Sequence, residues 1–194
     1  MSRVEEITQE IERLQAELEV ERTRRACDGC FRMKNGKPQF NAETRALHRR
    51  QKVTLAELRR RTPLRLLVTG PVIFSLIVPF AIIDLWVSLY MRLCFPLYGI
   101  PSVRRADYVR IDRHLLDYLN VFQKLYCVYC GYCNGVAAYV REVSSRTEAF
   151  WCPIKHASKV AGPHPRYATF LPYGDGKDYI ARLDESRARV RAEK

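Results

Sequence analysis

The sequence has none of the compact motifs by which several enzyme classes are recognised. No glycine-rich phosphate loop, no paired-carboxylate motif and no nucleophile elbow occurs in its 194 residues. It contains no C-x2-C-H, so covalent haem attachment is not indicated, and it has no recognisable motif for reading RNA or DNA. We therefore predict no catalytic residue and favour a binding or structural role over an enzymatic one.

Charge is nearly absent from one long stretch. Residues 66–103 carry only two charged side chains, Asp84 and Arg92, and begin with an uncharged run from Leu66 to Ile83. About eighteen apolar residues are close to the minimum for crossing a bilayer core, and this run begins too far into the chain to be a cleaved signal peptide. A buried core helix is the alternative, but 194 residues with 28% charged side chains would hardly enclose the stretch. We predict a membrane segment.

Basic residues flank this segment on both sides. They are Arg45, Arg49, Arg50, Lys52, Arg59, Arg60, Arg61 and Arg65 before it, and Arg104, Arg105, Arg110 and Arg113 after it. Because basic flanks tend to stay in the cytoplasm, we expect the cysteine-rich part to face the cytoplasm. A membrane-embedded hairpin or re-entrant loop satisfies both flanks, with breaks at Pro71, Pro79 and Pro96 and with Asp84 near the turn.

A single tilted span is the other possible topology, because two full spans need about forty apolar residues. The denser basic cluster would then be cytoplasmic and the cysteines would lie outside, where disulfides form. Membrane topology and cysteine chemistry are therefore linked.

The net charge of +12 is unevenly distributed. Between Arg22 and Arg65 there are fourteen Lys and Arg residues and three acidic ones. Next to a membrane segment, such a stretch most simply binds anionic lipid headgroups, with about 1 kcal/mol from each basic residue near the surface. Nucleic acid is the less favoured partner. The candidate membrane-surface residues are Arg59, Arg60, Arg61, Arg65, Arg104 and Arg105.

The chain begins with a heptad pattern. Apolar residues recur at alternating intervals of three and four, and glutamates cover the other faces; the apolar positions are Val4, Ile7, Ile11, Leu14 and Leu18. Fewer than three heptads form a marginal coiled coil alone, so residues 4–18 are expected to pair with another copy or a protein partner. An ordinary amphipathic surface helix is the alternative.

Four of the seven cysteines are spaced like metal ligands. Cys127, Cys130 and Cys133 form C-x2-C-x2-C, and Cys152, eighteen residues later, begins C-P-x2-H with His156. Thiolates three residues apart can reach one ion. Zinc is slightly favoured over an iron–sulfur cluster, because three thiolates and His156 suit tetrahedral zinc. Cys27 and Cys30 form a lone C-x2-C, which is a possible second site.

The helical pattern conflicts with a single four-ligand site. The sequence predicts one helix from Asp112 to Tyr129, a turn at Asn134-Gly135 and a second helical stripe over residues 136–150. A straight second helix would leave Cys152 roughly 22 Å or more from Cys133. Either this helix ends near Ser144-Ser145 and the chain returns extended to close the site, or Cys152 and His156 lie beside His114 and Asp117. The thiols can also be simply small buried side chains.

Motifs between Thr62 and His156 carry a wider resemblance. They include TPLR, VPFAIIDLWVSLY, CFPLYGIP, NGVAAYVREV and WCPIKHA. With these, the chain resembles an uncharacterised family of bacterial membrane-associated proteins that contain cysteines. The resemblance implies a location at the bacterial inner (cytoplasmic) membrane and no known activity. The family pattern does not require a cysteine at the position of Cys133. The resemblance therefore favours Cys127, Cys130, Cys152 and His156 as ligands.

The predicted fold is mainly α. It comprises an amphipathic, coiled-coil-like helix (residues 1–25), a basic juxtamembrane region with the C-x2-C (26–65), a membrane segment (66–103), a small helical Cys/His metal-binding module (104–161) and a polar tail that ends in a charged helix from about Asp178 (162–194). The predicted function is that of a membrane-attached metal-binding accessory protein with a structural, electron-transfer or complex-assembly role. The alternative is a thiol-dependent enzyme that uses Cys152 with His156 or His114.

Overall fold

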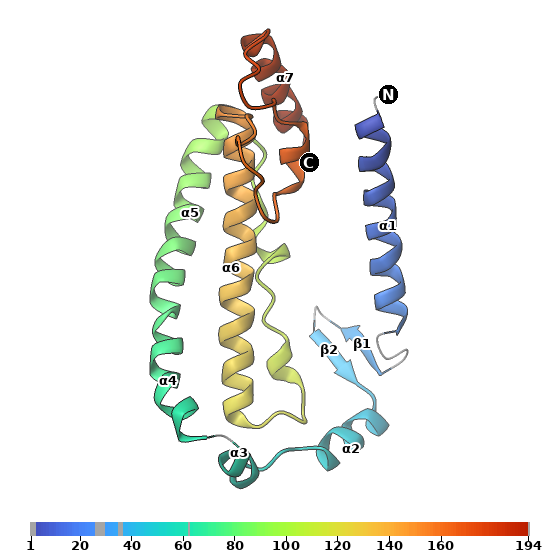
Figure 1. Cartoon of the computed structure of the whole chain (residues 1–194). Helices are drawn as coiled ribbons and strands as arrows, with labels where there is room; N and C mark the ends of the chain where they lie inside the picture. Colours follow the sequence, from blue (N-terminus) through green and yellow to red (C-terminus); the bar gives the residue numbers. More distant parts are fainter. Residues whose placement is uncertain (1–2, 26–29, 35–36, 62, 194) are drawn as a thin grey trace.

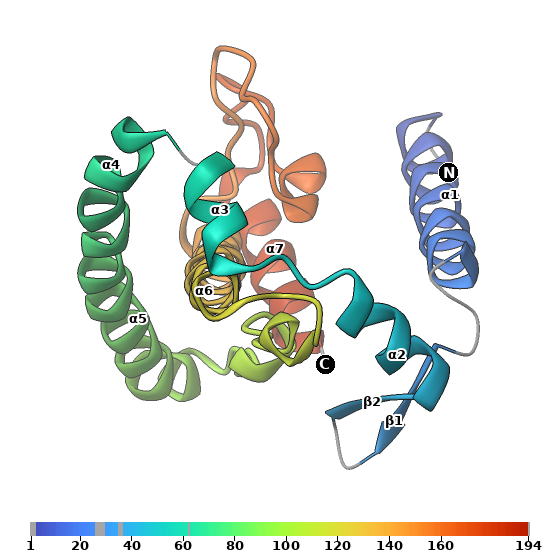
Figure 2. The same ribbon diagram turned by 90° about the horizontal axis from the view of Figure 1, so that it is seen from below.

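The computed structural model of the protein describes residues 3–25, 30–34, 37–61 and 63–193. These residues are mainly helical, as predicted, and include one long apolar helix (Figure 1). The two longest helical segments stand side by side and form the body of the molecule, with a C-terminal cap at one end (Figure 1). An N-terminal arm (residues 3–61) precedes this body. Its first helix stands apart from the body in both views (Figures 1 and 2), and the ring of His48 in the arm lies 4.9 Å from that of Tyr118.

The arm begins with α1 (Arg3–Arg25), which is rich in Glu, Arg and Leu, residues with high helix propensity. Arg13 pairs along its surface with Glu10 at 2.7 Å. The apolar positions Ile7, Ile11, Leu14 and Leu18 are 46–50% exposed. The predicted helix is present, and its coiled-coil pairing stays a prediction.

A small hairpin and two short helices follow. β1 (Phe31–Lys34) pairs antiparallel with β2 (Lys37–Phe40). The helices are α2 (Ala42–Arg50) and α3 (Leu55–Arg61). Asn41 caps α2, because its Oδ1 accepts a hydrogen bond from Thr44 N at 2.7 Å.

The apolar stretch forms α4 (Leu64–Ser75) and α5 (Ile77–Tyr98). They join at Leu76, whose backbone stays right-handed helical at φ −62° and ψ −16°, so the chain does not reverse. The predicted hairpin is therefore wrong. Pro79 has no N–H to donate, so one helical hydrogen bond is missing next to this junction. Residues Val68–Tyr98 form a helix of 31 residues that is long and apolar enough to cross a membrane.

The chain reverses at Gly99, which follows α5 with a left-handed φ of 71°. Ile100 N donates to Phe95 O at 2.9 Å and closes the end of the helix. We call residues 100–120 the returning segment; they contain η1 (Arg105–Asp107) and η2 (Arg113–Leu115) and run beside α6 (Figure 1).

Helix α6 (Val121–Trp151) begins later than the predicted start at Asp112. Its start is set by a capping box, in which Gln123 N donates to Asn120 Oδ1 and Asn120 N donates to Gln123 Oε1, both at 3.0 Å. Because this box satisfies the first turn of the helix at Asn120, residues 112–119 are left to the returning segment.

The turn predicted at Asn134-Gly135 is also wrong, because α6 continues through it. A Cβ atom at Gly135 would lie 2.7 Å from Val109 Cα and 2.9 Å from Tyr108 O. At Gly131 it would lie 3.0 Å from Arg110 O. Both glycines therefore allow the returning segment to lie directly against the helix.

The C-terminal cap contains η3 (Pro165–Thr169) and α7 (Tyr179–Ala192), the predicted charged helix. Backbone hydrogen bonds of 2.8 Å join Leu171 to Pro153 and Lys155. The core lies where the end of α5, the second half of α6 and α7 meet. Its buried members are Phe95, Ile100, Val103, Tyr139, Val143, Ala149, Phe150, Phe170 and Val190.

Candidate functional site

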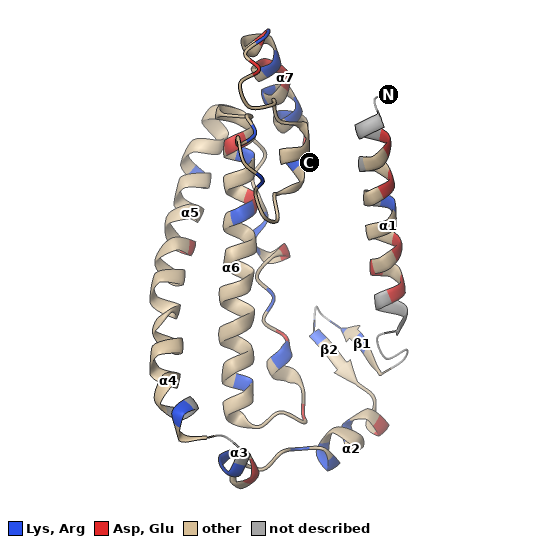
Figure 3. Ribbon diagram, viewed as in Figure 1, with Lys and Arg blue, Asp and Glu red and all other residues tan. Residues whose placement is uncertain are grey.

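The outer side of α4 and α5 is the most extensive apolar surface in the described part of the chain. In Figure 3 these helices are tan except for Arg65 near the start of α4 and the two charged residues of α5. Its exposed side chains include Val72, Val78, Ile82, Leu85, Trp86, Leu89, Leu93 and Leu97. Monomeric soluble proteins rarely expose contiguous apolar patches larger than a few hundred Å². This surface is therefore a candidate contact for a bilayer or another protein.

The inner side of α5 carries the one acidic residue of the apolar stretch. Asp84 is 8% exposed. Arg105 of the returning segment donates to it twice, from Nε to Oδ1 at 2.8 Å and from Nη2 to Oδ2 at 2.6 Å. Tyr132 of α6 donates its hydroxyl hydrogen to Oδ2 at 3.0 Å. This bidentate, charge-assisted contact fixes the returning segment against the middle of α5.

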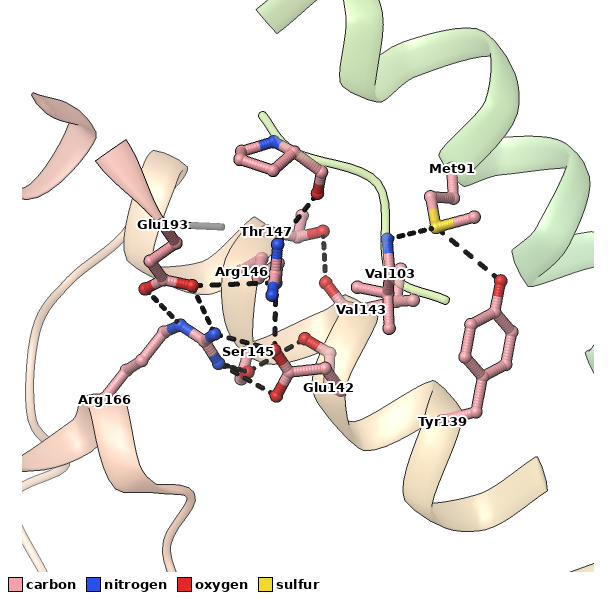
Figure 4. Close-up of polar contacts among 11 residues, drawn as sticks. Met91, Val103, Tyr139, Glu142, Val143, Ser145, Arg146, Thr147, Arg166 and Glu193 are labelled. Atoms are coloured by element: carbon pink, nitrogen blue, oxygen red, sulfur yellow. Dashed lines mark hydrogen bonds and ion pairs between the residues drawn. The ribbon is translucent and has the colours of Figure 1, made fainter. Parts of the chain in front are cut away.

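Further polar contacts join α5 to its neighbours near the core. Tyr139 of α6 donates to Met91 Sδ at 3.6 Å, and Val103 N donates to the same sulfur at 3.2 Å (Figure 4). The hydroxyls of Tyr90 and Thr147 lie 3.0 Å apart. The inner side of α5 is thus held by polar contacts, whereas its outer side is apolar.

An ion-pair network ties the C-terminal cap to α6. Arg166 Nη2 donates to Glu142 Oε1 at 2.7 Å, and Arg166 Nε donates to Glu193 Oε1 at 2.9 Å (Figure 4). Arg146 donates to the same Glu142 oxygen at 2.9 Å and to Pro101 O at 2.9 Å. Burial by itself would raise the pKa of Glu142, but the hydrogen bonds from Arg166 and Arg146 outweigh it and lower the pKa.

The structure separates the cysteines that the sequence pattern groups. Cys127, Cys130 and Cys133 lie within α6, and Cys152 is the residue that ends this helix. At about 1.5 Å per residue, Cys152 is roughly 28 Å from Cys133 along the axis. Within the described ranges, no group of three His, Cys, Asp or Glu side chains is placed to hold a metal ion. The structure therefore does not assemble the predicted ligand set, because the predicted break between the two helices is missing.

The thiols differ in exposure. Cys127 and Cys130 are partly buried, Cys133 is buried and Cys152 is exposed, and all four are free. Burial raises the pKa of the Cys133 thiol, which disfavours the thiolate that binds metal. Cys30 is disulfide-bonded, an oxidised state without a thiolate for metal binding. Cys27 lies outside the described residues.

The possible catalytic partners of Cys152 are also placed apart or otherwise engaged. His114 lies in η2, which contacts α6, and its neighbour Arg113 approaches Gly131. Gly131 is about 30 Å from Cys152 along the axis of α6. His156 Nδ1 lies 3.2 Å from the Tyr167 hydroxyl. The thiol-enzyme hypothesis stays a prediction, without an assembled nucleophile and base in the described residues.

The predicted membrane-surface residues fall into two groups. Arg59, Arg60 and Arg65 are exposed near the start of the apolar helix, and the side chain of Arg61 lies outside the described residues. Arg104 instead pairs with Asp107 at 2.6 Å, and Arg105 pairs with Asp84. Arg105 thus stabilises the fold. This role can be recognised only from the three-dimensional position of Asp84.

No known protein family matches the chain, and comparisons with curated proteins and with solved structures give no match.

Proposed function

We propose that this protein is a membrane-attached accessory protein with a structural or complex-assembly role. The observation that carries the proposal is the exposed apolar outer side of α4 and α5. The exposed basic residues Arg59, Arg60 and Arg65 support it, because they lie beside this surface in the sequence and suit anionic headgroups. The proposed location is the bacterial cytoplasmic membrane, with residues 104–161 on the cytoplasmic side.

The proposed partner is a protein or a second copy that binds the apolar stripe of α1. Four side chains of this stripe are about half exposed in the described chain. Burying a leucine or isoleucine fully is worth about 1.5–3 kcal/mol, so a helix that covers the stripe would stabilise α1 substantially. Nucleic acid is not part of the proposal.

Flotation with lipid vesicles tests membrane attachment. The double variant Trp86→Glu/Leu93→Glu places two charges on the outer side of α5, and Ala137→Glu/Ser144→Glu places two charges at the same spacing on exposed positions of α6. We expect the first variant to lose at least about 100-fold in vesicle affinity through lost apolar burial, and the second to bind like the wild type. Equal flotation of all three proteins, or none with the wild type, would overturn the proposal.

The basic residues are tested separately from the apolar surface. Replacing Arg59, Arg60 and Arg65 together by Gln should weaken binding to anionic vesicles by about 100-fold, at about 1 kcal/mol each. Binding to neutral vesicles should change little. An equal loss on both lipids would show that the arginines act through the fold and not through headgroups.

Metal binding remains a second proposal with a smaller ligand set. Its support is that Cys127 and Cys130 are free and three residues apart, so they are neighbours on the surface of α6. Two thiolates leave a tetrahedral zinc ion incomplete, so further ligands would have to come from a partner or a second copy. Metal content and the visible spectrum of protein purified anaerobically test this. About one colourless zinc per chain supports a site completed by a partner, and about one per two chains supports a site completed by a second copy. A brown protein indicates iron–sulfur, and no metal contradicts the proposal.

A further inference from the structure

The position of the returning segment bears on how the apolar helix meets the membrane. As the chain runs from Pro101 to Arg110, its contacts on α6 move from Arg146 back to Gly131. On α5, Val103 contacts Met91, and Arg105 contacts Asp84. The segment therefore runs back along α5, toward the start of that helix.

This arrangement places charged side chains level with the middle of the apolar helix. Asp84 is near the centre of Val68–Tyr98. Next to its partner Arg105, the side chain of Arg104 is 76% exposed and that of Arg110 is 67% exposed. If α5 crossed a bilayer in this fold, these arginines would lie at hydrocarbon depth. Charged side chains at that depth strongly disfavour insertion across the bilayer.

The same charges are compatible with a helix that lies along the surface. In Figure 1 α5 is at one edge of the bundle, and the returning segment lies on its inner side, where Arg105 holds Asp84, opposite the apolar outer side. The charged segment can then stay in water while the outer side of α5 is buried. Arg92 follows Asp84 by eight positions, which is roughly 80° around the axis. It therefore lies on the flank of the helix, where a long basic side chain can extend to the headgroups.

We infer that α4 and α5 lie in the plane of one leaflet, with their outer side among the acyl chains, and do not cross the bilayer. Interfacial helices of this kind are buried by about 5–10 Å at the boundary of headgroups and acyl chains. The occupant of the apolar surface is thus an anionic lipid leaflet, consistent with the basic residues that precede α4. The inference rests on the proposed membrane attachment and specifies its geometry.

Tryptophan depth measurements test the inference without removing any cysteine. Trp86 and Trp151 are the two tryptophans of the chain, and Trp151→Phe leaves Trp86 as the only reporter. Two further variants carry Trp151→Phe and Trp86→Phe together with either Val72→Trp or Leu97→Trp. The three proteins thus place a single tryptophan at three positions on the outer side. The native side chains at these positions are 69%, 69% and 81% exposed. Quenching by lipids brominated at a shallow and a deep acyl position then reports the depth of each probe.

The two geometries give different depth profiles. In the plane of the leaflet, all three probes should have the same shallow depth. In a spanning helix, the probe at Trp86 would be the deepest, and the probes at Val72 and Leu97 would lie roughly 21 Å and 16 Å from it along the axis. That profile would overturn the inference and leave membrane attachment intact. No quenching of any probe would overturn attachment itself; a dimer mass in solution would then identify a second copy as the occupant.

Discussion

The two halves of α6 have similar sequence patterns and different surroundings. In the first half, residues 121–134, Val121, Phe122 and Leu125 are more than half exposed. In the second half, residues 135–151, Val136, Tyr139 and Val143 are almost completely buried. Apolar residues recur at helical spacing in both halves. The periodicity thus shows which face of a helix is apolar, but not whether the same chain covers it.

The difference arises from what lies beside each half. The second half is covered by the end of α5, the C-terminal cap and the network around Glu142. Beside the first half, Tyr126 stacks on Phe74 of α4 with ring centroids 5.1 Å apart. The first half of α6 thus contacts the helix that we propose to contact lipid. We therefore expect the stability of the isolated protein to depend on the second half of α6.

Truncating one aromatic side chain in each half gives the largest expected contrast. Tyr139 is 0% exposed and Phe122 is 53% exposed. Tyr139→Ala should lower the free energy of unfolding by about 3–5 kcal/mol, because it leaves a cavity and an unpaired Met91 contact. Phe122→Ala should change it by less than about 0.5 kcal/mol. Urea unfolding of detergent-solubilised protein measures both; similar losses would show that the first half is packed against a partner in solution.

The network around Glu142 provides a pH-dependent test of the second half. Glu142→Gln should cost about 2 kcal/mol at pH 7, because two arginines lose a charged acceptor. The folded pKa of Glu142 is lowered from an ordinary 4.5. The stabilisation is therefore complete above about pH 4.5 and is lost as the pH falls through the folded pKa.

Unfolding free energies measured from pH 7 to pH 3 test this dependence. The difference between wild type and Glu142→Gln should shrink below about pH 4.5. Glu185→Gln, at an exposed position of α7, is the matched control and should have little effect at any pH. A constant difference across the range would show that the Gln substitution acts through packing.

The boundary between the two halves is tested by a smaller change. Gly135→Ala adds a Cβ within 2.7 Å of Val109 Cα. Overpacking costs about 1–3 kcal/mol, and the gain in helix propensity returns about 1 kcal/mol, so we expect a net loss of up to about 2 kcal/mol. Ala138→Ser, at an exposed position nearby, is the control. Increased stability of Gly135→Ala would show that the returning segment is not held against α6.

Local sequence signals predicted some helices and misplaced others. The helices at the two ends of the chain and the long apolar helix were predicted, because composition and periodicity are local properties. The turn predicted at Asn134-Gly135 was wrong because a glycine that permits a turn equally permits close backbone packing. The backbone of Tyr108 and Val109, which packs against Gly135, is not visible from the local sequence. Asn35-Gly36 between β1 and β2 is the strongest kind of hairpin signal, and it was available in the sequence.

The candidate site was harder to predict, because it depends on contacts between residues that are far apart in the sequence. The apolar surface was visible in the sequence as a run without charge. The pairing of Asp84 with Arg105 depends on the reversal at Gly99 and the return of the chain. The cysteine spacing suggested one ligand set, but whether four thiols converge depends on where helices end, and α6 does not end before Trp151.

The ion pair between Asp84 and Arg105 also has a consequence for biosynthesis. The two residues are 21 positions apart, and the carboxylate is made first. At about 5–20 residues per second, it leaves the ribosome one to several seconds before its partner. During that time the helix presents an uncompensated acid at its centre, which costs about 2.5–3.5 kcal/mol for insertion across a bilayer. In the geometry that we propose, with the helix at the membrane surface, this interval disfavours insertion across the bilayer until Arg105 emerges and pairs with Asp84.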